Sequence, residues 1–200
     1  MRDDVPSRPP AVRVTVGHRI SPGKLAELRA MGRDHVIAAI AEAQLGVIAR
    51  AQLVDAGVRP GAIQARLRRS QLHRLHRGVY AVGHTALVPP ARELSALLAC
   101  GAGAVVSHRS AARLWRMLAE EHETPVDVTL PRGAGRTRAG ILVHRTRHLE
   151  RADVRVIEGI PLTSPARTLL DLAEVAEDRE LESAYGEAVV RRLTNEHVFA

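Results

Sequence analysis

The fold is decided by two adjacent stretches of sequence, Pro60-Gly-Ala-Ile-Gln-Ala-Arg-Leu-Arg-Arg-Ser70 and Leu72-His-Arg-Leu-His-Arg-Gly-Val-Tyr-Ala-Val-Gly83. The first begins with a proline, which suits the first turn of a helix, and its apolar residues recur at helical spacing. The second holds two short strand-like runs, 72–75 and 79–82, around Gly78, which can take the positive φ of a tight hairpin turn. A helix followed directly by such a hairpin is the second half of a winged helix-turn-helix.

Two more helices are predicted upstream of these stretches. Apolar residues recur at helical spacing over 35–45, and a glycine then ends the segment. The stretch 50–56 indicates another helix, with Gly57 in its C-terminal cap position but with Ala49, a poor capping residue, at its start. Three short helices followed by a hairpin predict a winged helix-turn-helix DNA-binding domain at 35–84. A block of this size usually needs a neighbour to be comfortably stable.

The rest of the chain predicts a second, mixed unit at 91–193. Helical and strand-like patterns follow one another there, with a Gly/Arg-rich loop at 131–139 between two strands that should pair. The fold class is therefore α+β, an N-terminal winged helix-turn-helix followed by a small α+β domain. The expected helices are 92–100, 108–118, 165–175 and 178–193, and the expected strands are 104–106, 125–130, 140–145 and 154–157.

The two ends of the chain lack such patterns. Residues 1–34 hold several prolines, mix both charge signs and have no steady periodicity, which predicts a disordered or variable tail. Met31 directly precedes the first strongly periodic segment, which raises the hypothesis that translation starts there. Residues 194–200 begin like a capped helix and stop, so we expect a truncated C-terminal helix.

Composition limits the class of protein. The chain has 200 residues and a formal net charge of +7, which favours an anionic partner. It has no long uncharged apolar run and no apolar N-terminal stretch, so we expect a cytoplasmic protein without a membrane partner. Cys100 is the only cysteine, which excludes an internal disulfide and a CxxC metal site.

The helix at 60–70 carries the strongest functional signal. Ile63 and Leu67 must face the core, which turns Gln64, Arg68 and Arg69 outward. Arginine can pair with guanine and glutamine with adenine in the major groove of duplex DNA. No acidic residue interrupts 58–91, so these charges lack a local counter-charge. The residues that we expect to bind double-stranded DNA are Arg59, Gln64, Arg66, Arg68, Arg69, Arg74 and Arg77.

Two alternatives to DNA binding remain open at this stage. The helix could be an ordinary solvated basic surface in an arginine-biased chain, since Lys24 is the only lysine. Arg77 could belong to turn chemistry alone, with Gly78 providing the geometry.

Enzymatic and metal sites are not expected. A restriction-type nuclease needs a lysine beside its metal-binding carboxylates, and Lys24 lies in the tail. His144 and His148 have helical spacing but fall in and after a predicted strand, where they would not lie side by side. Ser107 and His108 stand at a predicted helix start, where capping by Ser107 is a better interpretation than nucleophilic catalysis. We therefore predict no catalytic site and no cofactor or metal.

Four segments together resemble AbiEi-family antitoxins of type IV toxin-antitoxin systems, as found in actinobacterial proteins. The resemblance implies an N-terminal winged-helix domain that represses its own operon. It also implies a following domain associated with neutralising a nucleotidyltransferase-like toxin, which would be a second partner. The segments are 47–83, Ser107-His-Arg-Ser-Ala-Ala-Arg-Leu-Trp115, Pro125-Val-Asp-Val-Thr129 and Gly159-Ile-Pro-Leu-Thr-Ser-Pro-Ala-Arg-Thr-Leu-Leu-Asp-Leu172.

The resemblance also leaves two other interpretations. Many actinobacterial chains of this shape continue into a domain resembling very-short-patch-repair endonucleases, which we expect this chain to lack. It could therefore be a truncated, nuclease-associated protein. It could also be a protein-binding module that neutralises a toxin, with DNA contact secondary.

Overall fold

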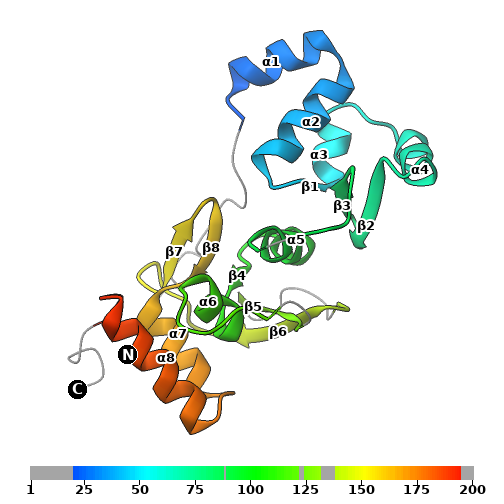
Figure 1. The fold of residues 1–200 in the computed structure, drawn as a ribbon. Coiled ribbons are helices and arrows are strands. Elements are labelled where there is room, and N and C mark those ends of the chain that lie inside the picture. The colour runs from blue at the N-terminus through cyan, green and yellow to red at the C-terminus, as the bar shows by residue number, and fades with distance from the viewer. Residues whose placement is uncertain (1–19, 88, 122–123, 132–137, 195–200) are drawn as a thin grey trace, which may run out of the picture.

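A computed structural model describes residues 20–194, apart from 88, 122–123 and 132–137 (Figure 1). It has the predicted α+β fold, with helices around two separate β-sheets. Residues 1–19 of the predicted tail, most of the Gly/Arg-rich loop and 195–200 of the predicted C-terminal helix lie outside the described residues.

The N-terminal half contains the expected helices and hairpin. A short strand between the helices at 33–43 and 50–55, which the sequence did not predict, joins the hairpin in an antiparallel sheet of order β1-β3-β2. This is the order of a winged helix-turn-helix. The elements are α2 (Arg33–Ala43), β1 (Val47–Ala49), α3 (Arg50–Asp55), α4 (Pro60–Arg68), β2 (Leu72–His76) and β3 (Val79–Val82).

Two glutamines hold the start of α3 in place, although Ala49 has no side chain that could cap it. The side-chain oxygen of Gln52 accepts a hydrogen bond from the Ala49 N–H at 2.8 Å. The amides of Gln52 and the buried Gln44 also bond to each other, at 2.7 and 3.0 Å, and Gln44 Nε2 donates to the Val47 carbonyl. The network ties the end of α2 to β1 and α3, so the helix start is held although Ala49 cannot cap it.

A helix lies where the sequence predicted only a tail. Helix α1 (Pro22–Met31) starts at Ser21, whose hydroxyl accepts from the Lys24 N–H at 3.4 Å. Leu25 and the buried Leu28 pack into the core of the winged helix-turn-helix. The tail prediction is therefore wrong for this segment, because two leucines in ten residues give too weak a periodic signal. A start at Met31 would remove these leucines from the core.

The second sheet has the order β6-β5-β4-β8-β7. Its strands β5 and β6 pair as expected, and the pairing is parallel, from Val126↔Ile141 to Pro131↔Thr146. Helices α6, α7 and α8 share a hydrophobic core with one another. The elements are β4 (Val105–Val106), α6 (His108–Leu114), β5 (Val126–Pro131), β6 (Ile141–Thr146), β7 (Val154–Ile157), β8 (Ile160–Thr163), α7 (Pro165–Ala173) and α8 (Asp178–Val190).

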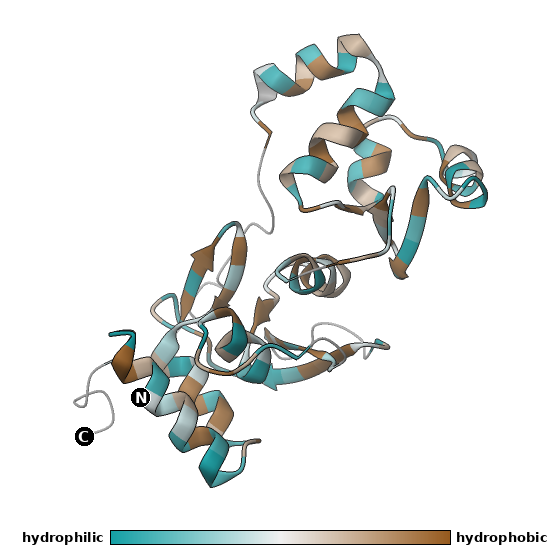
Figure 2. Ribbon diagram, in the orientation of Figure 1, coloured by the Kyte–Doolittle hydropathy of each residue, from teal (hydrophilic) through white to brown (hydrophobic). Residues whose placement is uncertain are grey.

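Helix α5 (Ala91–Cys100) lies between the two sheets (Figure 1). Its buried residues share one apolar cluster with Val47 and Val79 of the first sheet and with Val128 and Leu130 of the second. Figure 2 shows the central strand β4 as hydrophobic and much of α4 as hydrophilic. The two predicted units therefore meet through packed side chains at α5, while α4 keeps a free polar face. Among the described residues, the helices are all too short or too polar to cross a membrane.

Candidate nucleic-acid interface

Helix α4 has the orientation that its periodicity predicts. Ile63 is fully buried and Leu67 half-buried, whereas Gln64, Arg68 and Arg69 are exposed. Side chains four residues apart lie on one face of a helix, so Gln64 and Arg68 project side by side from the surface. The small residues on the same outer side leave room for close approach of a ligand surface.

Arg66 differs from its neighbours because it has an intramolecular partner. Its guanidinium forms an ion pair with the carboxylate of Asp34, in the first turn of α2. The Arg66 side chain is 22% exposed and that of Asp34 is 82% exposed. The prediction that Arg66 lacks a counter-charge is therefore wrong, because the acid comes from a residue assigned to the tail. This pair positions α4 against α2.

The other predicted arginines are exposed and uncompensated. None of them forms an ion pair or a side-chain hydrogen bond with any residue that the structure describes. Repulsion among them is relieved only by counter-ions or by an anionic ligand. They are Arg59 at the start of α4, Arg68 and Arg69 at its end, Arg74 on β2 and Arg77 in the hairpin turn.

The β2–β3 hairpin forms a short wing with a fixed tip. His76 faces Val79 across the hairpin, which leaves Arg77 and Gly78 as its turn, and Gly78 has a φ of +82°. The Gly78 carbonyl accepts from the Arg50 N–H at 2.8 Å, so the tip lies against the start of α3. The wing therefore presents Arg74 and Arg77 from a rigid support.

Contacts on the other side of the wing join it to the rest of the molecule. His76 Nε2 lies 3.4 Å from Ser95 Oγ of α5. Burial lowers the pKa of His76, and the nearby Arg138 guanidinium lowers it further. Protonation of His76 is thus disfavoured by its burial and by repulsion from Arg138.

Sequence reasoning missed three exposed arginines near this surface. Arg50 opens α3 beside the wing tip, and Arg29 and Arg33 lie at the junction of α1 and α2. Arg29 and Arg33 fall within 1–34, which was predicted to be a tail, so they were not predicted to bind DNA. Only recognition of Leu25 and Leu28 as core residues would have indicated that this segment folds back.

The serine and histidine at the start of α6 are enclosed. Ser107 is fully buried and its hydroxyl accepts from Thr129 Oγ1 at 2.7 Å and bonds to His108 Nδ1 at 2.9 Å. It makes no cap hydrogen bond, so the predicted capping role is wrong. The carboxylate of Asp127 takes that role, accepting from the Ser110 N–H at 3.3 Å.

Asp127 is the centre of a buried polar cluster. Its other oxygen accepts from His144 Nε2 at 2.8 Å, and the His144 ring stacks on His108 with centroids 3.5 Å apart. Burial, and then His144, lower the pKa of His108 to about 4, while Asp127 acts in the opposite direction. His148 is exposed and does not join this cluster. The described residues contain no group of His, Cys, Asp and Glu side chains arranged to hold a metal ion.

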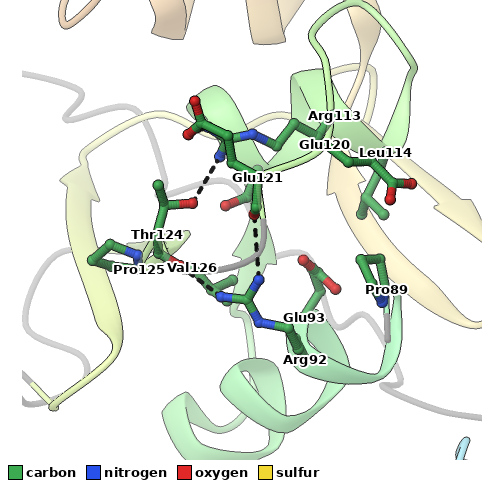
Figure 3. A pocket seen from close by; sticks show the side chains of 11 residues that line it. Pro89, Arg92, Glu93, Arg113, Leu114, Glu120, Glu121, Thr124, Pro125 and Val126 are labelled. Atoms are coloured by element: carbon green, nitrogen blue, oxygen red, sulfur yellow. Dashed lines mark hydrogen bonds and ion pairs between the residues drawn. The ribbon is translucent and has the colours of Figure 1, made fainter. Parts of the chain in front are cut away.

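A small cavity lies between α5, α6 and the segment before β5 (Figure 3). It measures about 20 Å³, which is room for one water molecule. Arg92 donates to the Thr124 carbonyl at 2.6 Å, and Arg113 to the Thr124 hydroxyl at 3.2 Å. Burial raises the pKa of Glu93, whose carboxyl points into the same space. This cavity has no room for a substrate.

Comparisons with known proteins add little to this geometry. No family model and no curated protein matches the chain. Among solved structures, a crystal structure of the RV2827C protein from Mycobacterium tuberculosis is similar, with 20% sequence identity and a TM-score of 0.46. The similarity covers 88% of this chain and 75% of that one. Such a distant likeness has no bearing on function, and the candidate interface depends on the residues described above.

Proposed function

We propose that this chain binds double-stranded DNA by placing α4 in the major groove, as a transcriptional regulator of the antitoxin type. The observation that carries the proposal is the outer face of α4, where Gln64, Arg68 and Arg69 are exposed and the two arginines have no partner among the described residues. Among the predicted arginines, Arg66 alone forms an ion pair with an acidic residue that the structure describes, Asp34.

The residue types on this face match the chemistry of base recognition. Arg68 can donate two hydrogen bonds to guanine O6 and N7, and Gln64 can bond adenine N6 and N7. Their separation by one helical turn suits contact with neighbouring base pairs. Arg74 and Arg77 on the wing have the charge and exposure for phosphate contacts, which position the helix without selecting sequence.

Arg68 is expected to select the base pair that it contacts. The unmodified protein is first used to select its preferred duplex from a randomised library. On that duplex, Arg68→Ala is expected to lose about 1–3 kcal/mol of discrimination at one base pair. The measurement is fluorescence anisotropy with the selected duplex and its single-position variants at fixed salt. Arg179→Ala is the matched control, because Arg179 is also exposed but lies on α8. Equal discrimination by the two variants would refute base contact by Arg68.

The antitoxin part of the proposal rests on the family resemblance. Autorepression would place the preferred duplex upstream of the chain's own gene, and a nucleotidyltransferase-like toxin would co-purify with the protein. A regulator of this kind acts in the cytoplasm and requires no catalytic step or cofactor. Co-purification without any duplex binding would favour the alternative of a toxin-neutralising module. A frameshift or further coding sequence downstream would favour the nuclease-associated alternative.

A further inference from the structure

A second basic site lies on the winged helix-turn-helix, at the junction of α1, α2 and the turn between α3 and α4. It is a pocket of about 280 Å³. Residues from the end of α3 and the turn after it line the pocket together with two arginines, one on α1 and one on α2. The lining residues are Arg29, Arg33, Val36, Asp55, Ala56 and Gly57.

The two arginines are held close to the turn by different contacts. Arg29 Nη2 donates to the Asp55 carbonyl at 3.3 Å, which leaves other N–H groups of this guanidinium available. Arg33 lies over Gly57, where an added Cβ would come within 3.5 Å of Arg33 Nε. Gly57 has a φ of +80°, so the turn itself also favours glycine. This close approach brings the Arg33 charge to the backbone of the turn.

The charge balance of the pocket is positive. Asp55 is the one acidic residue that lines it, and its carboxylate forms no ion pair with either arginine within the described part of the chain. Both arginine side chains are exposed. Two neighbouring guanidinium groups that reach solvent can bind a phosphate group. Their N–H donors match the geometry of the phosphate oxygens.

The position of the pocket relative to α4 identifies the source of that phosphate. Asp34, next to Arg33, pairs with Arg66 of α4, and the turn that lines the pocket leads directly to Arg59. The corner of α1 and α2 lies above α4 in Figure 1, and the wing lies below it. A helix in the major groove has one sugar-phosphate backbone on each side.

We infer that Arg29 and Arg33 form a phosphodiester-binding site for the DNA backbone on the side of α4 opposite the wing. This inference rests on the proposed function, since it assumes that α4 enters the groove. The wing arginines contact one strand and the Arg29–Arg33 pair contacts the other. The segment assigned to a tail thereby becomes part of the interface.

The test compares charge variants of Arg33 in the full chain. Arg33→Gln is expected to weaken binding about 5- to 10-fold at 0.1 M salt and to reduce the slope of log affinity against log salt by about 1. The loss should be equal for selected and random duplexes, because a phosphate contact carries no sequence information. Arg33→Lys should retain the slope, and Asp55→Asn should strengthen binding by removing a nearby negative charge.

The outcomes distinguish failure of the second site from failure of the proposed function. If Arg33→Gln binds both duplexes with the affinity and slope of an Arg179→Gln control while Arg68→Ala loses discrimination, the second site is refuted and DNA binding by α4 stands. If the unmodified protein binds neither duplex at any salt concentration, both proposals fail. Loss of discrimination in Arg33→Gln would also refute a phosphate role, because only base contacts should produce it.

Discussion

Replacing Asp127 with alanine is expected to lower the free energy of unfolding by about 3–5 kcal/mol. The Asp127 side chain is only 8% exposed and accepts hydrogen bonds from His144 Nε2, the Ser110 N–H and the Ser110 hydroxyl. Removal of the carboxylate leaves these donors without their partner at a position that is largely shielded from solvent. Denaturant unfolding followed by the fluorescence of Trp115, the only tryptophan, measures the effect.

Two further variants test whether the loss of stability comes from the hydrogen bonds of the Asp127 carboxylate. Asp127→Asn should lose less than Asp127→Ala, because an amide oxygen can still accept from one of the donors. Glu182→Ala, which removes an exposed carboxylate from α8, should stay within about 0.5 kcal/mol of the unmodified protein. If Asp127→Ala and Glu182→Ala are equally stable, the buried cluster contributes nothing and the prediction fails.

Acidification from pH 7.5 to pH 4 should remove about 3 kcal/mol of stability through His108 alone. Its pKa is about 4 in the folded protein against an ordinary 6.5. The unfolded chain therefore binds a proton more readily, and stability falls as the pH drops below 6.5. The cause is burial first, followed by the stacked His144 ring. His108 Nε2 is also buried without a hydrogen-bond partner in the described structure, so a proton there would gain no acceptor.

A difference measurement isolates this histidine from the carboxyl groups that titrate over the same range. His108 has a φ of +47°, and asparagine tolerates that conformation better than most residues, so His108→Asn removes the titrating ring with little added backbone strain. Between pH 7.5 and pH 4, the unfolding free energy of His108→Asn should fall by about 3 kcal/mol less than that of the unmodified protein. Parallel curves for the two proteins would contradict the assigned pKa.

Local patterns in the sequence were enough to predict the winged helix-turn-helix and the outer face of α4. Pro60 starts α4, Gly78 turns the hairpin, and Ile63 faces the core, so each feature depends on residues close together in the chain. The α+β character of the second half followed in the same way.

Features that depend on distant partners could not be predicted. The ion pair between Arg66 and Asp34 spans 32 residues, and no local pattern links them. Ser107 precedes a helix as a cap would, but Thr129 and His108 engage its hydroxyl instead. Helix α1 has few apolar residues and is held by tertiary packing, so periodicity alone gave no sign of it.

The packing of α5 against both sheets has a practical consequence for dissecting the protein. A fragment that stops at Gly83 retains the exposed arginines of α4 and the wing, yet it loses the helix that covers Val47 and Val79. Those two side chains would then face water, and a small fragment with such an open apolar surface tends to self-associate. Excision of the N-terminal half is therefore expected to give a fragment that associates with a second copy of itself through Val47 and Val79.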